Sequence, residues 1–413
     1  MMNFKINRMF QVTVVTSSLL FSTIGVAASA DNPNQVDFAL ISDPHVDITN
    51  YRAVNINPNS TYKGADLDKP SFVTLVSKLS NELSQLPEMP SFIVVLGDLP
   101  SHNAGSRRAD TLRYVYQTFY EQLNPMPMFF SFGNNDSLER NYGNFKYRGN
   151  SAYEILKSVT GKGGFLSSGT SCPFTNQPCV SNKNETYGYY SAYIGDHLKL
   201  ISLNSVTFVS RPSFSPSRAG DKEQLQWLRN EIKQSQANQE QVILTMHIAP
   251  NSWESTYKSS FKDIINAYPG VVIGMMAAHS HYDELRVIVS GKQTIPIIFS
   301  AGLSTGHGNS ASFKTISINR VASGKPWTMQ NYTTYYFKGY KADSSTVQKY
   351  YDFKSVFCSP DSSSLFTCIY GMMNRKGSDY AFDSKSSKLL SEHYYANPAV
   401  PGKTNATGWV LNY

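Results

Sequence analysis

The sequence is poor in charged residues, and this shortage narrows the classes of protein it can belong to. Of its 413 residues, 16% are charged and 41% are hydrophobic, which is typical of a globular chain rather than a disordered one. The net charge is +7, but no run of Lys or Arg suggests a nucleic-acid groove. Beyond the N-terminus, no stretch is long and apolar enough to span a bilayer.

Cysteine is also scarce, and the four cysteines fall into two close pairs, Cys172 with Cys179 and Cys358 with Cys368. In an exported chain an even number of cysteines predicts disulfides, and four cysteines allow three connectivities. Short local loops favour pairing within each close pair. A zinc site is the alternative, but neither pair has the two-to-four-residue spacing of a zinc knuckle.

The first 30 residues predict a secretory signal peptide. Lys5 and Arg8 form a charged start, an uncharged stretch follows, and small residues end the segment at 28–30, as in cleavable signals. A membrane anchor is the weaker alternative because Gln11 and several Thr and Ser interrupt the apolar stretch. We therefore expect an exported protein, secreted or periplasmic. Loss of the two cations lowers its net charge from +7 to +5.

Five apolar runs each lead into a short polar segment, and these runs cover residues 38–41, 92–96, 128–132, 242–246 and 271–276. Short runs rich in Val, Ile and Phe predict buried strands. Ligands of open α/β sheets bind outside the carboxyl ends of the strands. We therefore expect one sheet edge to gather the donors that follow the runs: Asp43, His45, Asp98, Asn134, His247, His279 and His281.

Helical spacing separates several of these runs. Apolar residues recur at intervals of three and four in 72–86, 111–123 and 222–234, which predicts amphipathic helices covering a central sheet in a layered α/β fold. Residues 187–203 predict a hairpin, 295–299 and 313–318 predict strands, and 161–190 predict a long loop. The tail predicts a mostly helical subdomain. The expected divisions are thus 1–30, 31–338 and 339–413.

The chemical types of the donors predict a pair of metal ions. Asp43 and His45 are two residues apart and would point to the same side of an extended segment, and His279 and His281 repeat this spacing. Asp98 directly follows a glycine, which suits a carboxylate bridging two cations. Mixed imidazole and carboxylate ligands favour zinc, iron or manganese. Two such ions ~3.5–4 Å apart can clamp both oxygens of a phosphoryl displacement.

These segments resemble the signature of the calcineurin-like metallophosphoesterases, which runs Asp-X-His, Gly-Asp, Gly-Asn-His-Asp/Glu, His and Gly-His-X-His. The likeness covers about residues 37–313. Residues 42–47, 96–103 and 281–284 are further similar to the acid sphingomyelinase-like phosphodiesterases. The resemblance implies a layered sandwich of two central β-sheets flanked by helices, with a small helical C-terminal cap.

The resemblance also implies a division of the ligands between two divalent ions. The ions would be zinc, with iron or manganese as alternatives, and a hydroxide between them would attack phosphorus in line. One ion would be held by Asp43, His45 and His281, the other by Asn134, His247 and His279, with Asp98 bridging both.

Two positions depart from the family pattern. Ala278 replaces a glycine, and Asn135 replaces the histidine that protonates the leaving group. An amide can bind a phosphoryl oxygen but cannot supply the proton. His102 matches a second active-site histidine of the sphingomyelinase-like group and is the candidate general acid, a role worth ~10²–10⁴-fold; an ordinary polar loop residue is the alternative. His307, in a loop after a strand, is a candidate substrate contact.

These inferences predict an exported phosphodiesterase that acts on phospholipid-headgroup (sphingomyelin-like) or nucleotide-type esters. A phosphomonoesterase is the second hypothesis, and a catalytically weak binder of phosphorylated ligands is the third. A purple acid phosphatase-like iron site is disfavoured because Leu99, not tyrosine, follows Asp98. We expect a small-molecule or lipid phosphoester as the partner, transient contact with a membrane surface, and a monomer.

Overall fold

The structure is a computed structural model. It describes residues 32–57, 64–123, 126–160, 165–166, 174, 179–209, 221–291, 293–398, 402 and 409–413. The predicted signal peptide and Cys172 lie outside these residues.

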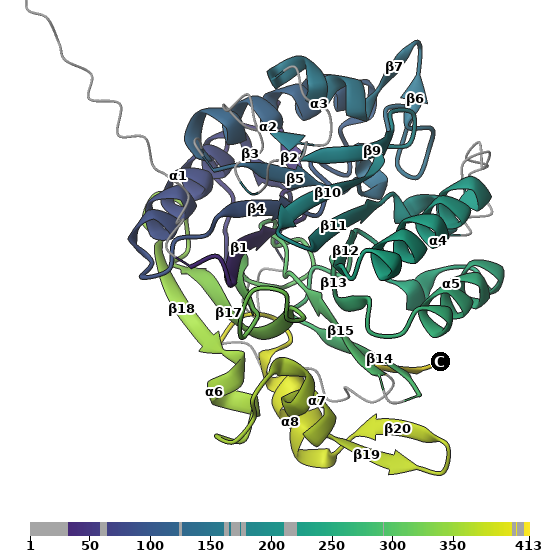
Figure 1. Cartoon of the computed structure of the whole chain (residues 1–413). Coiled ribbons are helices and arrows are strands. Elements are labelled where there is room, and N and C mark those ends of the chain that lie inside the picture. The colour runs from purple at the N-terminus through teal and green to yellow at the C-terminus, as the bar shows by residue number, and fades with distance from the viewer. Residues whose placement is uncertain are drawn as a thin grey trace, which may run out of the picture.

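Two β-sheets form the centre of the molecule (Figure 1). The first has the strand order β18 (Thr346–Asp352), β17 (Thr328–Lys338), β16 (Ser312–Asn319), β1 (Gln35–Ile41), β4 (Phe92–Val95), β5 (Met128–Phe130) and β8 (Phe165–Leu166). The second has the order β21 (Val410–Asn412), β14 (Leu285–Ser290), β15 (Gln293–Phe299), β13 (Val272–Ala277), β12 (Gln241–Met246), β11 (Leu198–Leu203), β10 (Tyr189–Gly195) and β9 (Val180–Asn184).

The alternation of side chains along β1 explains why this strand is buried on both faces. Phe38 and Leu40 belong to an apolar cluster that also contains residues of the second sheet, such as Ile243. Ala39 and Ile41 point to the opposite face and belong to a cluster that includes the stripes of the flanking helices. The predicted sandwich of two sheets flanked by helices is therefore confirmed.

Helices cover the outer faces of the sandwich. α1 (Lys69–Gln85), α2 (Arg108–Leu123) and α3 (Ala152–Thr160) lie on the side of the first sheet, and α4 (Asp221–Ala237) and α5 (Ser255–Ala267) lie on the side of the second (Figure 1). Asp68 precedes α1, and its side chain accepts a hydrogen bond from Ser71 N at 2.9 Å, a favourable N-cap. The helices predicted from apolar spacing are confirmed in α1, α2 and α4.

One local prediction is confirmed and one is wrong. β10 and β11 form the predicted antiparallel hairpin, with Tyr190 opposite Ser202. The predicted long loop at 161–190 instead contains β9, which pairs with β10 at the edge of the second sheet. β9 has mostly exposed polar side chains, so backbone pairing rather than an apolar pattern forms it.

The C-terminal region is less helical than the sequence predicts. It contains α6 (Phe353–Phe357), α7 (Leu365–Gly371) and α8 (Ser384–His393), but also a hairpin of β19 (Met373–Lys376) and β20 (Asp379–Phe382). β18 and β21 extend the two central sheets, because main-chain pairing there outweighs the helical signals.

The predicted disulfide between Cys358 and Cys368 is confirmed. Cys179 is also disulfide-bonded. Across the described residues, no helix combines the length and apolarity needed to cross a bilayer.

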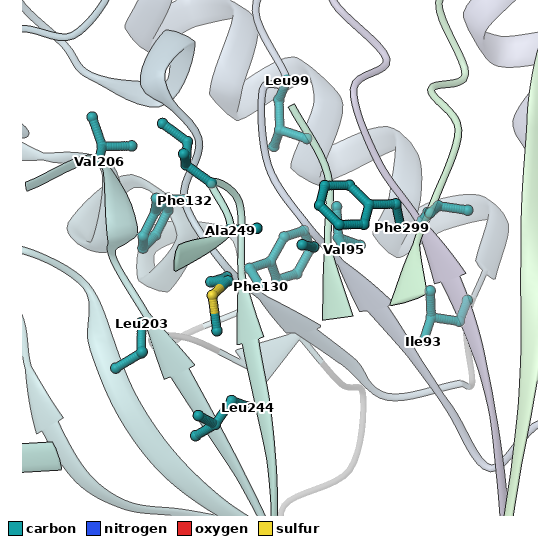
Figure 2. Close-up of a cluster of buried hydrophobic side chains, with 14 of the residues drawn as sticks. Ile93, Val95, Leu99, Phe130, Phe132, Leu203, Val206, Leu244, Ala249 and Phe299 are labelled. Atoms are coloured by element: carbon teal, nitrogen blue, oxygen red, sulfur yellow. The ribbon is translucent and has the colours of Figure 1, made fainter. Parts of the chain in front are cut away.

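The two sheets meet over the cluster that contains Phe38, Leu40 and Ile243. Figure 2 shows part of the other cluster, with Val95 and Phe130 of the first sheet and Leu244 and Phe299 of the second. Ser131, directly after β5, hydrogen-bonds across the interface to hydroxyl groups of the second sheet. This packing fixes the ends of the strands relative to one another.

Candidate metal centre

The carboxyl ends of five strands converge at one edge of the sandwich. Asp43 follows β1, Asp98 follows β4, Asn134 follows β5, His247 follows β12 and His279 follows β13. Backbone hydrogen bonds join these loops directly. Asp43 N donates to Gly97 O at 3.0 Å, and Ala278 N donates to His247 O at 2.9 Å. The structure thus brings all the predicted ligand segments together.

Five of the predicted ligands have a left-handed backbone, which residues other than glycine rarely adopt. The φ angles are 48° at Asp43, 43° at His45, 56° at Asp98, 71° at His279 and 64° at His281. The expectation that the Asp-X-His and His-X-His segments are extended is therefore wrong. Each such residue costs of order 1–3 kcal/mol and persists only where surrounding contacts hold it. Such strain clusters at functional sites.

Two glycines allow the loops at this edge to approach each other. Gly97 has φ 87°, and a Cβ atom there would collide with the backbone of Gly133. A Cβ atom at Gly133 would collide in turn with the carboxylate of Asp98. A side chain at either position would push these loops apart, which explains why glycine precedes both Asp98 and Asn134.

The donor atoms form two adjoining groups. In the first, Asp43 Oδ1 lies 3.5 Å from His281 Nε2 and 3.8 Å from His45 Nε2, and the two imidazole Nε2 atoms are 3.1 Å apart. The second consists of Asp98, His247 and His279, whose donor atoms lie within 4.8 Å of one another.

Asp98 connects the two groups. Its Oδ2 atom lies 3.5 Å from His45 Nε2 and 3.4 Å from His247 Nε2. Asp98 thus lies between two groups of donor atoms, and the division of ligands that the family resemblance implies stays a prediction. Asn134 lines the same cavity, and its Nδ2 donates to Asn141 Oδ1 at 2.7 Å.

Several buried donor atoms in these groups make no hydrogen bond, and this fits a cation site. They are Asp43 Oδ1 and Oδ2, Asn134 Oδ1 and His247 Nε2. Buried polar atoms without a partner are rare because each one loses its hydration without compensation. All four are atoms that can ligate a metal. The residues present therefore suit the pair of divalent ions.

Main-chain carbonyl groups orient two of the imidazoles. His247 Nδ1 hydrogen-bonds Leu96 O at 2.7 Å, and His45 Nδ1 hydrogen-bonds Pro100 O at 3.1 Å. A proton on Nδ1 leaves Nε2 with its lone pair toward the other donors, as in most histidine ligands of metals.

The charges within the site are mutually stabilising. Burial would raise the pKa of Asp43, but His281, His45 and His247 outweigh it and hold this pKa below its usual range. Burial would also raise the pKa of Asp98, but the neighbouring imidazoles outweigh it and hold this pKa well below its usual value. Both carboxylates are thus ionised at neutral pH, as metal ligands must be.

Asp136 is a structural member of the site that the sequence interpretation left without a role. Its carboxylate accepts hydrogen bonds from the backbone N of Asp98 at 2.8 Å, Leu99 at 2.9 Å and Gly133 at 2.6 Å. It therefore ties the Asp98 loop to the Asn134 loop. Burial and the nearby Asp98 raise the pKa of Asp136 to about 7. The acidic position that closes the Gly-Asn-His-Asp/Glu signature could have identified this residue.

Asn135 lies beneath the site rather than in its cavity. Its side-chain Nδ2 donates to Asp98 Oδ2 at 2.8 Å, and its backbone N donates to Asp98 Oδ1 at 2.7 Å. Arg108 hydrogen-bonds the Asn135 carbonyl oxygen. The side chain is fully buried. Asp98 thus accepts the Nδ2 donor of this amide, and the expected contact of Asn135 with a substrate stays a prediction.

A cavity of about 370 Å³ opens over the donors, and its lining includes Asp98, His102, Asn134, His279, His281 and His307. His102 stacks on His45 with ring centroids 4.1 Å apart, and His307 stacks on His281 at the same separation. Tyr142 OH lies 3.3 Å from His279 Nε2. The structure thus puts the two predicted non-ligand histidines on the wall of the cavity.

Asp66 holds His102, and sequence reasoning missed this residue. Asp66 Oδ1 lies 2.8 Å from His102 Nδ1, and Asp66 Oδ2 accepts from His102 N at 2.8 Å. Burial acts in the opposite direction, but the hydrogen bond from His102 lowers the pKa of Asp66, so an ionised carboxylate accepts the Nδ1 proton. The two residues are 36 positions apart, and no local motif signals their contact.

Comparison with known proteins identifies related sequences. The sequence model of the family described as calcineurin-like phosphoesterase matches residues 36–283. Human cyclic GMP-AMP phosphodiesterase SMPDL3A is 26% identical over 136 residues, or 30% of this chain and 30% of that protein. Sphingomyelin phosphodiesterase 2 of Caenorhabditis elegans is 22% identical over 294 residues, or 66% of this chain and 44% of that protein. The chain thus spans less than half the length of these relatives.

Solved structures of dimetal and nucleotide-hydrolysing proteins are also similar. A dimetal phosphatase from Danio rerio matches 76% of this chain and 99% of its own, with 14% identity and a TM-score of 0.44. A 5′-nucleotidase from Candida albicans matches 72% of this chain and 51% of its own, with 12% identity and a TM-score of 0.37. At these TM-scores the likeness carries no further inference.

Proposed function

The chain belongs to the calcineurin-like phosphoesterases, and from this premise we propose that it is an exported phosphodiesterase with two metal ions. The observation that carries the proposal is the set of buried donor atoms on Asp43, Asn134 and His247 that make no hydrogen bond. They lie under a cavity lined by further imidazoles. Buried atoms without a hydrogen bond also occur elsewhere among the described residues, as at Tyr116 OH, but here carboxylate, amide and imidazole donors gather at one point, as metal ligands do.

The residues divide between the two ions as the family pattern implies. Imidazole and carboxylate donors favour zinc, with iron or manganese as alternatives, over calcium or magnesium. When bound, the two cations would neutralise charge on the phosphoryl oxygens and acidify a water molecule for attack. The proposed ligands are Asp43, His45 and His281 for one ion, Asn134, His247 and His279 for the other, and Asp98 for both.

His102 is the proposed general acid. Because Asp66 accepts the Nδ1 proton, the other ring nitrogen, Nε2, is the atom available to protonate the leaving oxygen. Asp66 acts as a positioning residue through this bond. His307, stacked on His281 at the cavity wall, would contact the substrate beside the reacting phosphate.

Two substrate types follow from the relatives. Their names specify a cyclic GMP-AMP phosphodiesterase and a sphingomyelin phosphodiesterase, so the proposed substrates are nucleotide-type and phospholipid-headgroup diesters. Contact with a membrane surface and a monomeric state stay predictions.

Asn135 motivates an alternative, a catalytically weak binder of phosphorylated ligands. The histidine expected at this position is replaced by an amide that hydrogen-bonds Asp98, so His102 is the one proton donor proposed for the leaving group. Phosphomonoester hydrolysis is the other alternative, because the same pair of ions serves both reactions.

Two measurements on the mature protein, metal content and ester hydrolysis, test these alternatives. Mass spectrometry is expected to find two metal ions per chain, and the protein is expected to hydrolyse bis-para-nitrophenyl phosphate faster than the para-nitrophenyl monoester. Faster hydrolysis of the monoester would favour the phosphomonoesterase. If the protein holds two ions but neither it nor the Asn135→His variant hydrolyses either ester, it is a binder of phosphorylated ligands rather than an enzyme. A protein that retains no metal would refute the proposal.

A further inference from the structure

Two consecutive residues on the wall of the metal cavity have no role in the proposed mechanism. They are Asn141 and Tyr142, which line the cavity together with the proposed ligands Asn134 and His279. Neither lies in the signature segments behind the family resemblance. Each contacts a side chain that is proposed to hold the same ion, since Asn141 contacts Asn134 and Tyr142 contacts His279.

Asn141 determines which end of the Asn134 amide is available to a cation. Asn134 Nδ2 donates a hydrogen bond to Asn141 Oδ1 at 2.7 Å, whereas the buried Asn134 Oδ1 makes no hydrogen bond to any residue that the structure describes. An amide has an oxygen that can ligate a metal at one end and an NH₂ donor at the other. Because Asn141 holds the donor end, the oxygen stays available. The reverse orientation would present N–H groups, which repel a cation.

Tyr142 contacts one ring nitrogen of His279. Its hydroxyl oxygen lies 3.3 Å from His279 Nε2, and the two rings meet edge to face with centroids 6.3 Å apart. A histidine ligand almost always donates its other ring N–H to a neighbouring acceptor, which fixes the ring and its tautomer. A hydroxyl oxygen can accept from Nε2–H, and Nδ1 then carries the lone pair for a cation. His247 and His45 have the opposite arrangement, with Nδ1 hydrogen-bonded.

Backbone and side-chain hydrogen bonds hold the loop that carries both residues. Tyr142 has a φ angle of 58°, and its backbone N donates to Asn134 O at 3.0 Å. Glu139 Oε2 accepts from Asn144 N at 3.0 Å, which joins the two ends of the loop. A left-handed residue other than glycine persists only where surrounding contacts hold it. The loop thus presents Asn141 and Tyr142 to the cavity in a fixed conformation.

We propose that Asn141 and Tyr142 are positioning residues for the ion assigned to Asn134, His247 and His279, called the second ion below. Asn141 sets the direction of the Asn134 amide, and Tyr142 sets the tautomer and orientation of the His279 ring. This role rests on the proposed function, which supplies the pair of ions, and deepens it by naming residues that orient two of the ligands.

Zinc titrations of the mature protein, stripped of metal by a chelator, test the two roles. Zn²⁺ is added in competition with a chromogenic chelator, which gives a dissociation constant for each ion. Asn134→Ala identifies the binding step of the second ion, because it removes a proposed ligand. Asn141→Ala and Tyr142→Phe remove the two orienting contacts. The matched controls, Asn150→Ala and Tyr147→Phe, alter exposed side chains that do not line the cavity.

We expect Asn141→Ala and Tyr142→Phe each to weaken binding of the second ion roughly tenfold or more, the lower end of the effect of a residue that orients a metal ligand. The affinity for the other ion should change less, and the controls should bind both ions as wild type does. An unchanged affinity for the second ion would overturn the role of the residue concerned. Equal weakening of both ions, with a lower free energy of unfolding of the metal-free variant, would assign that residue to the fold of the loop instead.

A double-mutant cycle with Asn134→Asp separates orientation of the amide from general support of the loop. A carboxylate at this position offers an oxygen in either orientation and has no N–H to donate, so Asn141 has nothing left to orient. In the Asn134→Asp background, Asn141→Ala should change the affinity for the second ion by less than about twofold, a clear failure of additivity. A loss as large as in the wild-type background would overturn the orienting role of Asn141.

The wild-type titration separates this role from the proposed function. If wild type binds two ions, the metal centre stands, and the variants alone decide whether Asn141 and Tyr142 are positioning residues. If wild type binds fewer than two ions, the proposed pair of ions is refuted, and the positioning role is refuted with it.

Discussion

Two buried clusters of polar side chains differ in how far the protein satisfies them. In the first, Asp283 Oδ1 accepts hydrogen bonds from Lys314 Nζ at 2.6 Å and Tyr351 OH at 2.9 Å, and Asp283 Oδ2 accepts from Thr334 Oγ1 at 3.0 Å. In the second, Asp43 is equally buried, but neither of its carboxylate oxygens makes a hydrogen bond.

The difference separates a structural role from a functional one. The Asp283 cluster is closed, because protein donors satisfy both carboxylate oxygens, so it needs no ligand and links β16, β17 and β18 to the loop after His281. The Asp43 cluster is open, because its donors point at one another and at the cavity. A closed network rigidifies the fold, whereas an open one is costly until a ligand completes it.

The same substitution in both clusters tests this contrast, and the largest effect on activity is expected at Asp43. Asp43→Asn removes a charge from the proposed ligand set, and several kcal/mol of transition-state stabilisation depend on the ions. We expect metal content to fall below two ions per chain and kcat/KM to fall roughly 10³-fold or more. Mass spectrometry and diester assays measure both.

The stability of the metal-free Asp43→Asn protein is the control. The Asp43 side chain makes no hydrogen bond that the substitution removes, but the ion pairs with His281 and His45 are lost, so the free energy of unfolding in denaturant with a chelator should fall by less than that of Asp283→Asn. A large loss of stability without loss of metal would show that Asp43 belongs to a structural network instead.

Asp283→Asn should reverse this pattern. The substitution leaves the Lys314 ammonium buried without its counter-ion, which is expected to lower the free energy of unfolding by about 3–5 kcal/mol. Denaturant unfolding measures the change. Adding Lys314→Met removes the stranded charge and is expected to recover part of the loss. Equal losses in the single and double variants would contradict the role assigned to this ion pair.

The sequence predicted the positions of the donors well because each one follows an apolar strand. The runs before Asp43 and Asp98 form β1 and β4, and the runs before His247 and His279 form β12 and β13. Parallel pairing aligns the carboxyl ends within each of these two pairs, and the packing of the two sheets brings both pairs to one edge. Short-range pattern and strand direction are enough for that step.

The conformations of the donors could not be predicted in the same way. Asp43 and His45 have positive φ angles that follow from hydrogen bonds with the Asp98 loop, more than fifty residues away in the sequence. Local propensity favours an extended segment there, and tertiary contacts override it. The contact of Asp66 with His102 and the pairing of the polar strand β9 likewise depend on distant segments.

His102 belongs to neither cluster, because one ring nitrogen is satisfied and the other is available at the cavity wall. His102→Ala should keep both ions, since His102 is not a proposed ligand. Its kcat/KM should fall roughly 10²-fold on esters with a poorly acidic leaving alcohol, the lower end of general acid catalysis. Nitrophenyl esters, whose leaving group needs no proton, should lose much less. An equal loss on both ester types would mean that His102 binds the phosphate instead.

Asp66→Asn should give the smallest of these effects. It shows whether the hydrogen bond from Asp66 to one ring nitrogen of His102 contributes to catalysis. The carboxylate accepts from both Nδ1 and the backbone N of His102, whereas an amide offers one accepting oxygen and would turn a donor toward the other group. The ring would lose the bond that keeps its proton on Nδ1. We expect kcat/KM to fall roughly tenfold, the lower end of the effect of an orienting partner, again only on esters with a poorly acidic leaving alcohol.

Two further variants are the controls. Asp66→Glu should restore part of the activity. Combining Asp66→Asn with His102→Ala should add nothing to the loss from His102→Ala alone, because Asp66 is argued to act through that ring. An additive loss, or one shared by nitrophenyl esters, would assign Asp66 to the fold of the loop rather than to the orientation of the acid.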